Sequence, residues 1–188
     1  TAKVNPGDSV VVIGCGGVGL NVIQGAVLAG AGKIIAVDLL ENKLGYALQF
    51  GATHVINAGT TDAVAEIHDL TYGGADHAFE AIGNSKTILQ AYQATCLGGV
   101  TTIVGMAAET DEVAINCLSL PRTEKTIQGS WYGGARPSVD LPKMVDLYME
   151  GKLKVDELVS RTYPFHEINE AYAALDSGEV ARSILLFD

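Results

Sequence analysis

The sequence predicts a doubly wound α/β fold built on a parallel sheet of six strands. Six short apolar runs rich in β-branched residues recur along residues 10–132, and turn residues bound each of them. Segments of helical length separate these runs, and strands that alternate with helices favour a parallel sheet covered on both faces. The composition agrees, because 48% of the 188 residues are hydrophobic and only 18% are charged. That is enough apolar material for a large core.

The elements follow in order from the turn at Pro6-Gly7-Asp8, after which an unbroken β-branched run indicates a strand buried on both faces. The predicted strands are residues 10–13, 34–37, 53–56, 75–79, 100–104 and 126–132. The predicted helices are residues 17–29, 41–50 and 62–70, and then a helix that Asn84 caps, with Ile88, Ala91, Tyr92 and Thr95 on one face.

The pattern changes after Gly133-Gly134-Ala135. Asp140 is predicted to cap a helix that ends at Gly151 and carries Leu141, Met144, Val145 and Tyr148 on one face. A further helix stops at Gly178 and carries Ile168, Ala171, Tyr172 and Leu175 on one face. Extended runs at residues 159–163 and 181–187 have no partner in a sheet of six strands. We therefore predict one domain over residues 1–137 and a separate carboxy-terminal segment over residues 138–188.

Charge and cysteine usage exclude several classes of protein. Twelve Lys and Arg against 22 Asp and Glu give a net charge of −10, which leaves no basic surface for nucleic acid. Residues 9–32 carry no charge, but their many glycines favour a strand, a turn and a helix over a membrane span. Three cysteines without a C-x-x-C pair predict buried thiols in a reducing, cytoplasmic setting. The first residue is Thr1 rather than Met, which is typical of a processed piece.

A glycine motif follows the first strand and opens the first helix. It reads Gly14-Cys15-Gly16-Gly17-Val18-Gly19, a G-x-G-x-x-G in the context of a dinucleotide-binding Rossmann domain. In this motif Gly14 permits a tight turn, Gly16 admits the pyrophosphate, and Gly19 lets the helix approach the strand. Asp38 ends the second strand 19 residues after Gly19, where an acid binds the ribose hydroxyls. Because Asp38 would repel a 2′-phosphate, the motif predicts NAD rather than NADP.

No catalytic group or metal site can be identified from spacing. Tyr148 and Lys152 form a Y-x-x-x-K, but Gly151 separates them and Tyr148 is expected to be a core residue. The four histidines make no zinc pattern with the cysteines, and His77 is interpreted as structural. Glu80 ends the fourth strand on the cofactor side, and we favour a structural role for it over a chemical one.

The chain resembles the carboxy-terminal half of zinc-dependent, medium-chain alcohol dehydrogenases along nearly its whole length. The resemblance rests on the segment from Gly7 through the glycine motif, Ala36-Val37-Asp38 with Lys43, Phe50-Gly51-Ala52-Thr53, Gly73-Gly74-Ala75-Asp76, Phe79-Glu80-Ala81-Ile82-Gly83 and Ser177-Gly178-Glu179 with Arg182. Within the family it is most similar to the class III, thiol-dependent formaldehyde dehydrogenase branch.

The resemblance implies a set of cofactor-binding residues. Asp38 and Lys43 would hold the adenosine ribose, and Leu39 and Ile82 would flank the adenine. Main-chain groups of Gly17 and Val18, with the Arg182 side chain, would face the pyrophosphate. The nicotinamide would meet Val104, Met106, Ser130 and Tyr132. In this family the carboxy-terminal segment rejoins a catalytic domain, which would explain the two extra strands.

The resemblance also implies what lies outside these residues. Zinc, its ligands and the proton relay would belong to the full-length parent, in which zinc polarises an alcohol so that hydride passes to NAD. This chain alone is expected to bind NAD without turnover of an alcohol or aldehyde. The strand from Thr126 to Tyr132 resembles the edge that pairs with a second copy, which implies a homodimer.

Two alternatives remain open from the sequence. The first is a zinc-free medium-chain reductase or a polyol dehydrogenase of the same superfamily. The second is a non-enzymatic module that senses NAD, because the glycine motif serves both roles. The segment with Arg182 favours the enzyme, since a sensor has no evident need for strands that complete a catalytic domain.

Overall fold

The computed structural model describes residues 1–187. The chain divides into two compact units, Thr1–Ala135 and the residues from Arg136 onward. The boundary after residue 137 and the roles of the two segments remain predictions.

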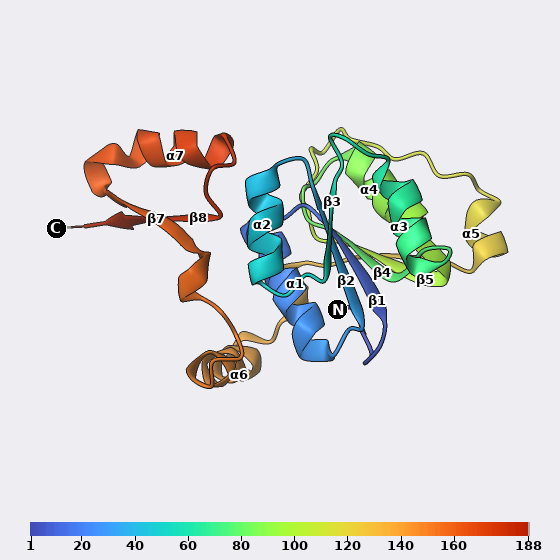
Figure 1. Cartoon of the computed structure of the whole chain (residues 1–188), viewed down its shortest axis with the longest axis horizontal. Helices are drawn as coiled ribbons and strands as arrows, with labels where there is room; N and C mark the ends of the chain where they lie inside the picture. The colour runs from blue at the N-terminus through green and yellow to red at the C-terminus, as the bar shows by residue number, and fades with distance from the viewer. Residues whose placement is uncertain (188) are drawn as a thin grey trace. The chain divides into compact units, whose positions relative to one another are not determined.

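The first unit is a parallel sheet of six strands in the order β3-β2-β1-β4-β5-β6 (Figure 1). The strands are β1 (Ser9–Ile13), β2 (Lys33–Asp38), β3 (His54–Asn57), β4 (Ala75–Glu80), β5 (Thr95–Ile103) and β6 (Thr126–Gly129). The strand order reverses between β1 and β4, so the predicted doubly wound Rossmann fold is confirmed.

Helices cover both faces of this sheet (Figure 1). On one face lie α1 (Gly17–Ala29) and α2 (Glu41–Gln49), and on the other lie α3 (Ala63–Thr71) and α4 (Ser85–Ala94). The core runs through the central strand, in which Val10, Val11 and Val12 have no exposed surface. Burial on both faces explains why this strand is continuously apolar instead of alternating.

Side chains cap the N-termini of two of these helices, as the residue types predict. Asp62 Oδ1 accepts hydrogen bonds from the main-chain N–H groups of Val64 and Ala65, at 3.1 and 3.2 Å. Asn84 Oδ1 accepts one from Thr87 N at 2.9 Å, so the predicted cap of α4 is confirmed. The prediction that Thr95 belongs to this helix is wrong, because Thr95 is extended and begins β5.

The edge strand is shorter than the sequence predicts. β6 ends at Gly129 and not at Tyr132, although Ser130 N still donates to Ile103 O at 2.8 Å. Tyr132 has a φ of 48° and Gly133 a φ of 67°, so the chain turns away from the ladder. A turn of 3₁₀ helix, η1 (Tyr132–Gly134), occupies this position. A short helix, α5 (Ser119–Thr123), which was not predicted, lies between β5 and β6.

The second unit contains two helices and a pair of parallel strands. Its elements are α6 (Pro137–Met149), η2 (Asp156–Leu158), β7 (Val159–Pro164), η3 (Phe165–Glu167), α7 (Ile168–Asp176) and β8 (Arg182–Leu186). β7 pairs with β8, and Tyr163, Ala171, Ala174 and Val180 form a small core. The two extra strands that the sequence left without a partner therefore pair with each other.

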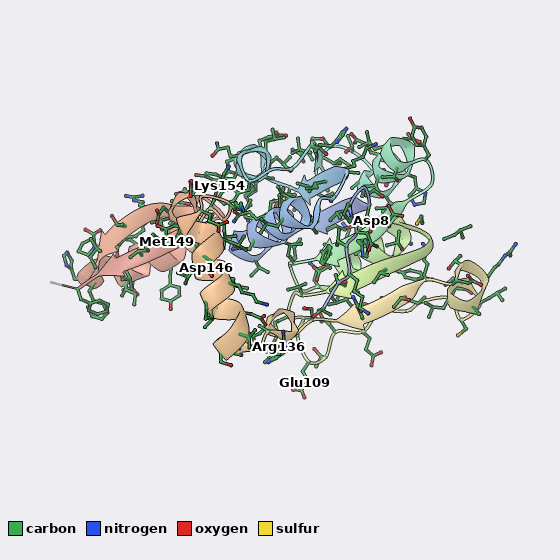
Figure 2. The ribbon with its side chains drawn as sticks, turned by 90° about the horizontal axis from the view of Figure 1, so that it is seen from below. Asp8, Glu109, Arg136, Asp146, Met149 and Lys154 are labelled. Atoms are coloured by element: carbon green, nitrogen blue, oxygen red, sulfur yellow. The ribbon has the colours of Figure 1, made fainter. Side chains whose placement is uncertain are left out.

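Helix α6 differs from its prediction at its start and on its apolar face. It begins at Pro137, a residue suited to the first helical position, so Asp140 lies in the first turn and is not the cap. Asp140 Oδ2 instead accepts from Arg136 N at 2.7 Å. Tyr148 is 37% exposed and donates from its hydroxyl to Asp156, so its expected core position is wrong. Figure 2 marks Asp146 and Met149 on this helix, and Met149 is 76% exposed.

None of the helices within residues 1–187 combines the length and apolar character needed to cross a membrane.

Candidate functional site

The turn between β1 and α1 has the close contacts that its glycines predict. Gly14 has a φ of 95°, and a Cβ placed there would lie 2.5 Å from Ile82 Cγ1. At Gly19 a Cβ would lie 1.7 Å from the carbonyl oxygen of Gly14, so only glycine lets α1 approach the turn. Gly16 differs, because no atom lies within 4 Å of the Cβ position. Its backbone therefore faces open space that a ligand can reach.

The N-terminus of α1 lacks the capping that α3 and α4 possess. Gly16 occupies the cap position without a side-chain hydrogen bond, and the first turn contains no acidic residue. The first N–H groups of a helix have no partner within the helix, and the helix dipole places partial positive charge there. Gly17 and Val18 thus present main-chain donors, and Val18 is 48% exposed. This end of α1 is suited to bind a phosphate group.

Asp38 lies at the end of β2 with only 9% of its surface exposed. Its Oδ1 accepts from Leu39 N at 2.8 Å and from Leu40 N at 3.1 Å, and its Oδ2 accepts from Cys15 N at 2.8 Å. A carboxylate has about four acceptor positions, so Oδ2 retains one for a ligand hydroxyl. The bond to Cys15 N, which the sequence did not predict, ties this acid to the glycine turn.

Burial determines the chemistry of the thiol in this turn. It raises the pKa of Cys15 to about 12, and the nearby carboxylate of Asp38 acts in the same direction. The Cys15 thiol also points at Val37 O, 3.6 Å away. Cys15 is therefore a protonated, structural thiol and not a nucleophile.

Three loops meet at the edge of the sheet where the parallel strands end. The loop after β1 contacts Ile82 through Gly14, and a Cβ on Gly83 would lie 2.5 Å from the main chain of Met106. A Cβ on Gly105 would lie 2.2 Å from Gly83 N. Ile82 and Met106 themselves are 49% and 70% exposed. The structure thus brings the loops with Gly14, Ile82 and Met106 together, as a shared binding site requires.

Gly83 and Gly105 were not identified from the sequence as residues that let the loops pack together at the carboxyl ends of the strands. Each follows a strand, and Gly83 has a φ of 91° that favours glycine. Their position in the loops that follow β4 and β5 was the available signal, because ligands of doubly wound sheets bind beyond the carboxyl ends of the strands.

The remaining predicted site residues lie at several places. Leu39 is 64% exposed beside Asp38, and Lys43 is half-buried on α2. Val104 follows β5, and its N–H donates to Glu80 O. Ser130 and Tyr132 follow β6, where Tyr132 is 84% exposed. Arg182 is exposed at the start of β8 in the second unit, so its place at the pyrophosphate stays a prediction.

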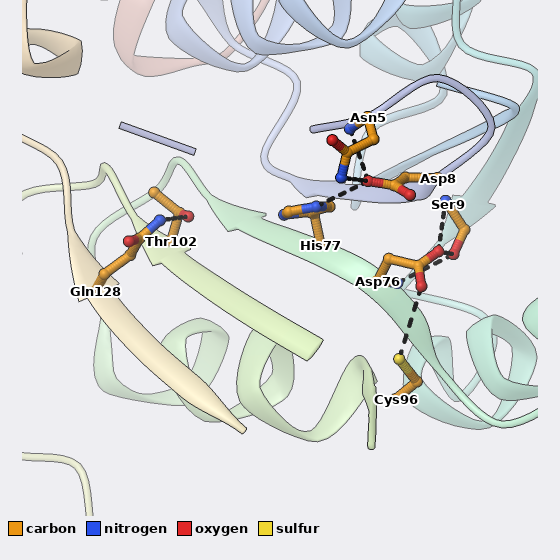
Figure 3. Close-up of polar contacts among 8 residues, drawn as sticks. All are labelled: Asn5, Asp8, Ser9, Asp76, His77, Cys96, Thr102 and Gln128. Atoms are coloured by element: carbon orange, nitrogen blue, oxygen red, sulfur yellow. Dashed lines mark hydrogen bonds and ion pairs between the residues drawn. The ribbon is translucent and has the colours of Figure 1, made fainter. Parts of the chain in front are cut away.

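A second polar cluster lies at the opposite, amino-terminal edge of the sheet (Figure 3). His77 Nε2 lies 3.2 Å from Asp8 Oδ2, and Asp76 Oδ2 accepts from Ser9 N and Ser9 Oγ. Partial burial alone would raise the pKa of Asp76, but the bonds from Ser9 and the nearby His77 outweigh it and lower that pKa. These contacts join the start of β1 to β4, and they border a cavity of about 490 Å³. They support the structural interpretation of His77.

No group of three or more His, Cys, Asp or Glu side chains that could hold a metal occurs within residues 1–187. The donors present therefore do not fit a zinc ion.

Comparisons with known proteins agree with this geometry. The model of the zinc-binding dehydrogenase family matches residues 17–150. A class-3 alcohol dehydrogenase of Cereibacter sphaeroides is 40% identical over 196 residues, which cover all of this chain and 52% of the relative. An S-(hydroxymethyl)glutathione dehydrogenase of Saccharomyces cerevisiae is 39% identical over 194 residues, which cover all of this chain and 50% of the relative.

Solved structures of dehydrogenases also resemble this chain. The crystal structure of benzyl alcohol dehydrogenase from Acinetobacter calcoaceticus superposes with a TM-score of 0.95 at 37% identity, over 99% of this chain and 51% of that one. The 2R,3R-butanediol dehydrogenase of Bacillus subtilis does so with a TM-score of 0.85 at 33% identity, over 98% of this chain and 52% of that one. The chain spans about half the length of the relatives it matches.

Proposed function

This chain belongs to the zinc-binding dehydrogenase family, and on that premise we propose that it forms the NAD-binding part of an alcohol or aldehyde oxidoreductase. One observation carries the proposal. The uncapped N-terminus of α1 and the free acceptor position of Asp38 lie on the two sides of one turn, joined by the bond from Cys15 N to Oδ2. A pyrophosphate suits the first group and a ribose hydroxyl suits the second.

The residues of this chain bind and orient the cofactor. Gly16, Gly17 and Val18 hold the pyrophosphate through main-chain groups, and Asp38 with Lys43 holds the adenosine ribose. Leu39 and Ile82 flank the adenine, while Val104, Met106, Ser130 and Tyr132 face the nicotinamide. NAD, when bound, supplies the carbon that accepts hydride from an alcohol. A 2′-phosphate would meet the Asp38 carboxylate, which favours NAD over NADP.

For the whole protein we propose hydride transfer between a small alcohol and NAD. The similarity to class-3 alcohol dehydrogenases and S-(hydroxymethyl)glutathione dehydrogenases favours class-3 chemistry, with S-(hydroxymethyl)glutathione as the type of substrate. The described residues do not fit zinc, and we expect this chain by itself to bind NAD without turnover of an alcohol. A cytoplasmic location belongs to the same proposal, since all three cysteines are free thiols.

We also propose a homodimer of this chain. β6 pairs with β5 on one side only within the described residues, and its other side presents unpaired main-chain groups. A second copy of the same strand would satisfy these groups by continuing the sheet. The pairing strand is four residues long, from Thr126 to Gly129, and not the longer strand to Tyr132 that the sequence predicted.

The variant Gly16→Ala tests cofactor binding at the turn. The backbone of Gly16 is extended, with φ −74° and ψ −173°, and its Cβ position is empty, so alanine fits the fold. The added methyl group would occupy the space of the pyrophosphate. We expect NADH binding at least tenfold weaker, measured by nicotinamide fluorescence, with the thermal midpoint unchanged.

The matched control is Gly25→Ala. Gly25 lies in the middle of α1, exposed and also without atoms within 4 Å of its Cβ position. This variant should bind NADH normally and gain about 0.5–1 kcal/mol of stability from helix propensity. Equal NADH binding by the wild-type chain and Gly16→Ala would exclude this turn as the phosphate site.

A further inference from the structure

Glu80 is a buried acid for which the proposed mechanism has no use. It is the last residue of β4 and has no exposed surface. The strand register places it between Ile13 of β1 and Ile103 of β5, at the carboxyl edge of the sheet. This is the place where the strand order reverses and where doubly wound sheets bind their ligands.

The carboxylate of Glu80 organises the loop that follows it. Its Oε1 accepts hydrogen bonds from Ile82 N at 2.9 Å, Gly83 N at 2.8 Å and Thr87 Oγ1 at 2.8 Å. The first two donors belong to the loop after β4, and Thr87 belongs to the first turn of α4. One oxygen atom thus fixes the path of the chain from the strand into the helix.

Glu80 contacts the loop after β5 as well. Its main-chain oxygen accepts from Val104 N at 2.9 Å and from Gly105 N at 3.0 Å. A Cβ on Gly105 would lie 2.6 Å from Glu80 Oε2, so this loop packs directly against the carboxylate. A shift of the side chain would therefore displace both loops, which already touch through Gly83 and Met106.

We propose that Glu80 is a positioning residue for the dinucleotide. It does not touch the cofactor but sets the loop with Ile82 at the adenine end and residues 104–106 at the nicotinamide end. This inference rests on the proposed binding of NAD. A buried acid with three donors on one oxygen and a loop against the other is placed to hold this binding edge rigid.

The variant Thr87→Val tests the proposal with little change in shape. It removes one of the three donors to Glu80 Oε1 and keeps the volume of the side chain. We expect NADH binding about fivefold weaker, the effect of losing one hydrogen bond that orders the loop. The control is Thr101→Val, because Thr101 Oγ1 is buried in β5 without a hydrogen-bond partner. This control should bind NADH within twofold of the wild-type chain.

Two substitutions of the acid itself complete the test. Glu80→Gln keeps an oxygen for the three donors, whereas Glu80→Ala removes it, so Gln should restore part of the NADH affinity that Ala loses. Hydrogen exchange of the Ile82 and Gly83 amides without cofactor gives a second readout, and it should be faster in Thr87→Val than in Thr101→Val. If Glu80→Ala does not fold, Thr87→Val alone decides.

The outcomes separate this inference from the proposed function. Unchanged NADH affinity in Thr87→Val, and in Glu80→Ala where that variant folds, with or without a lower thermal midpoint, would show a purely structural acid and overturn the inference. An equal loss of NADH affinity in Thr101→Val would also overturn the inference, since Thr101 does not act through Glu80. If the wild-type chain does not bind NADH, the proposed function fails, and the inference fails with it.

Discussion

At the residue scale, Asp38 combines a structural task with the proposed recognition of ribose. Its two oxygens accept three main-chain N–H groups, one of which belongs to the glycine turn. An acid that both fixes the turn and faces the ligand explains how β1 and β2 can present one site. Replacing it should therefore affect stability and specificity together.

The variant Asp38→Asn tests this double role. An amide group can accept on one side only, so its NH₂ would face either Cys15 N or the N–H groups of Leu39 and Leu40. We expect the unfolding free energy to fall by about 1–3 kcal/mol, the cost of an unsatisfied buried donor. The preference for NADH over NADPH should shrink at the same time. Chemical denaturation and cofactor titration measure the two effects, and a variant that keeps both properties would contradict the account.

Single residues also show what the sequence could predict about the site. The roles of Gly14 and Gly19 followed from the motif, because its spacing implies a turn and a close approach of helix to strand. The hydrogen bonds of Glu80 could not be predicted from the sequence, because they depend on how three loops stack in space. The exposure of Tyr148 was missed because an apolar face predicts burial only when another element covers it.

At the element scale, local chemistry decided which boundaries were predictable. α1 has the predicted bounds since glycines stand at both of its ends, and Gly30 has the left-handed φ of 81° that ends helices. The end of β6 could not be predicted, because the positive φ of Tyr132 is unusual for an aromatic residue. The start of α6 was misplaced because Pro137 precedes an acid that also suits a cap.

The edge strand β6 gives the prediction at this scale. Ser130 N donates to Ile103 O, and parallel strands alternate, so Gly129 N points away from β5. Gly129→Pro removes this outward donor and keeps the bonds to β5. The control Gly129→Ala keeps the donor, and its added Cβ would have no atom within 4 Å. In sedimentation, we expect Gly129→Pro to be a monomer at concentrations where the wild-type chain and Gly129→Ala are dimers. A dimeric Gly129→Pro would place the interface elsewhere.

At the scale of the whole molecule, the two edges of the sheet perform different tasks. The carboxyl edge presents loops and open main-chain groups, while the amino edge joins its strands through side chains such as Asp76 and Ser9 (Figure 3). The sequence predicted the doubly wound sheet because its buried strands are continuously apolar. It could not predict the amino-edge contacts, since Ser9 and Asp76 are 67 residues apart in the chain.

Asp76 makes this stabilisation dependent on pH. Its pKa is lower in the folded chain than in the unfolded chain, so it stabilises the fold above the unfolded pKa of ~3.9 and loses this effect as the pH falls through the folded value. The thermal midpoint of Asp76→Asn should therefore lie below that of the wild-type chain at pH 7, and the difference should shrink as the pH falls through the folded-state pKa of Asp76. Asp69→Asn, at an exposed position of α3, is the control. A difference that persists unchanged into acid would show that the charge of Asp76 is irrelevant.

The measurement that tests the central claim most directly is a parallel titration of this chain with NADH and NADPH. Nicotinamide fluorescence reports the cofactor, and Trp131, the one tryptophan in the sequence, gives an independent protein signal. We predict saturable binding of NADH at least tenfold tighter than that of NADPH, about 1.4 kcal/mol. Equal binding of both cofactors, tighter binding of NADPH, or no binding of either would contradict the assignment of this chain as an NAD-binding domain.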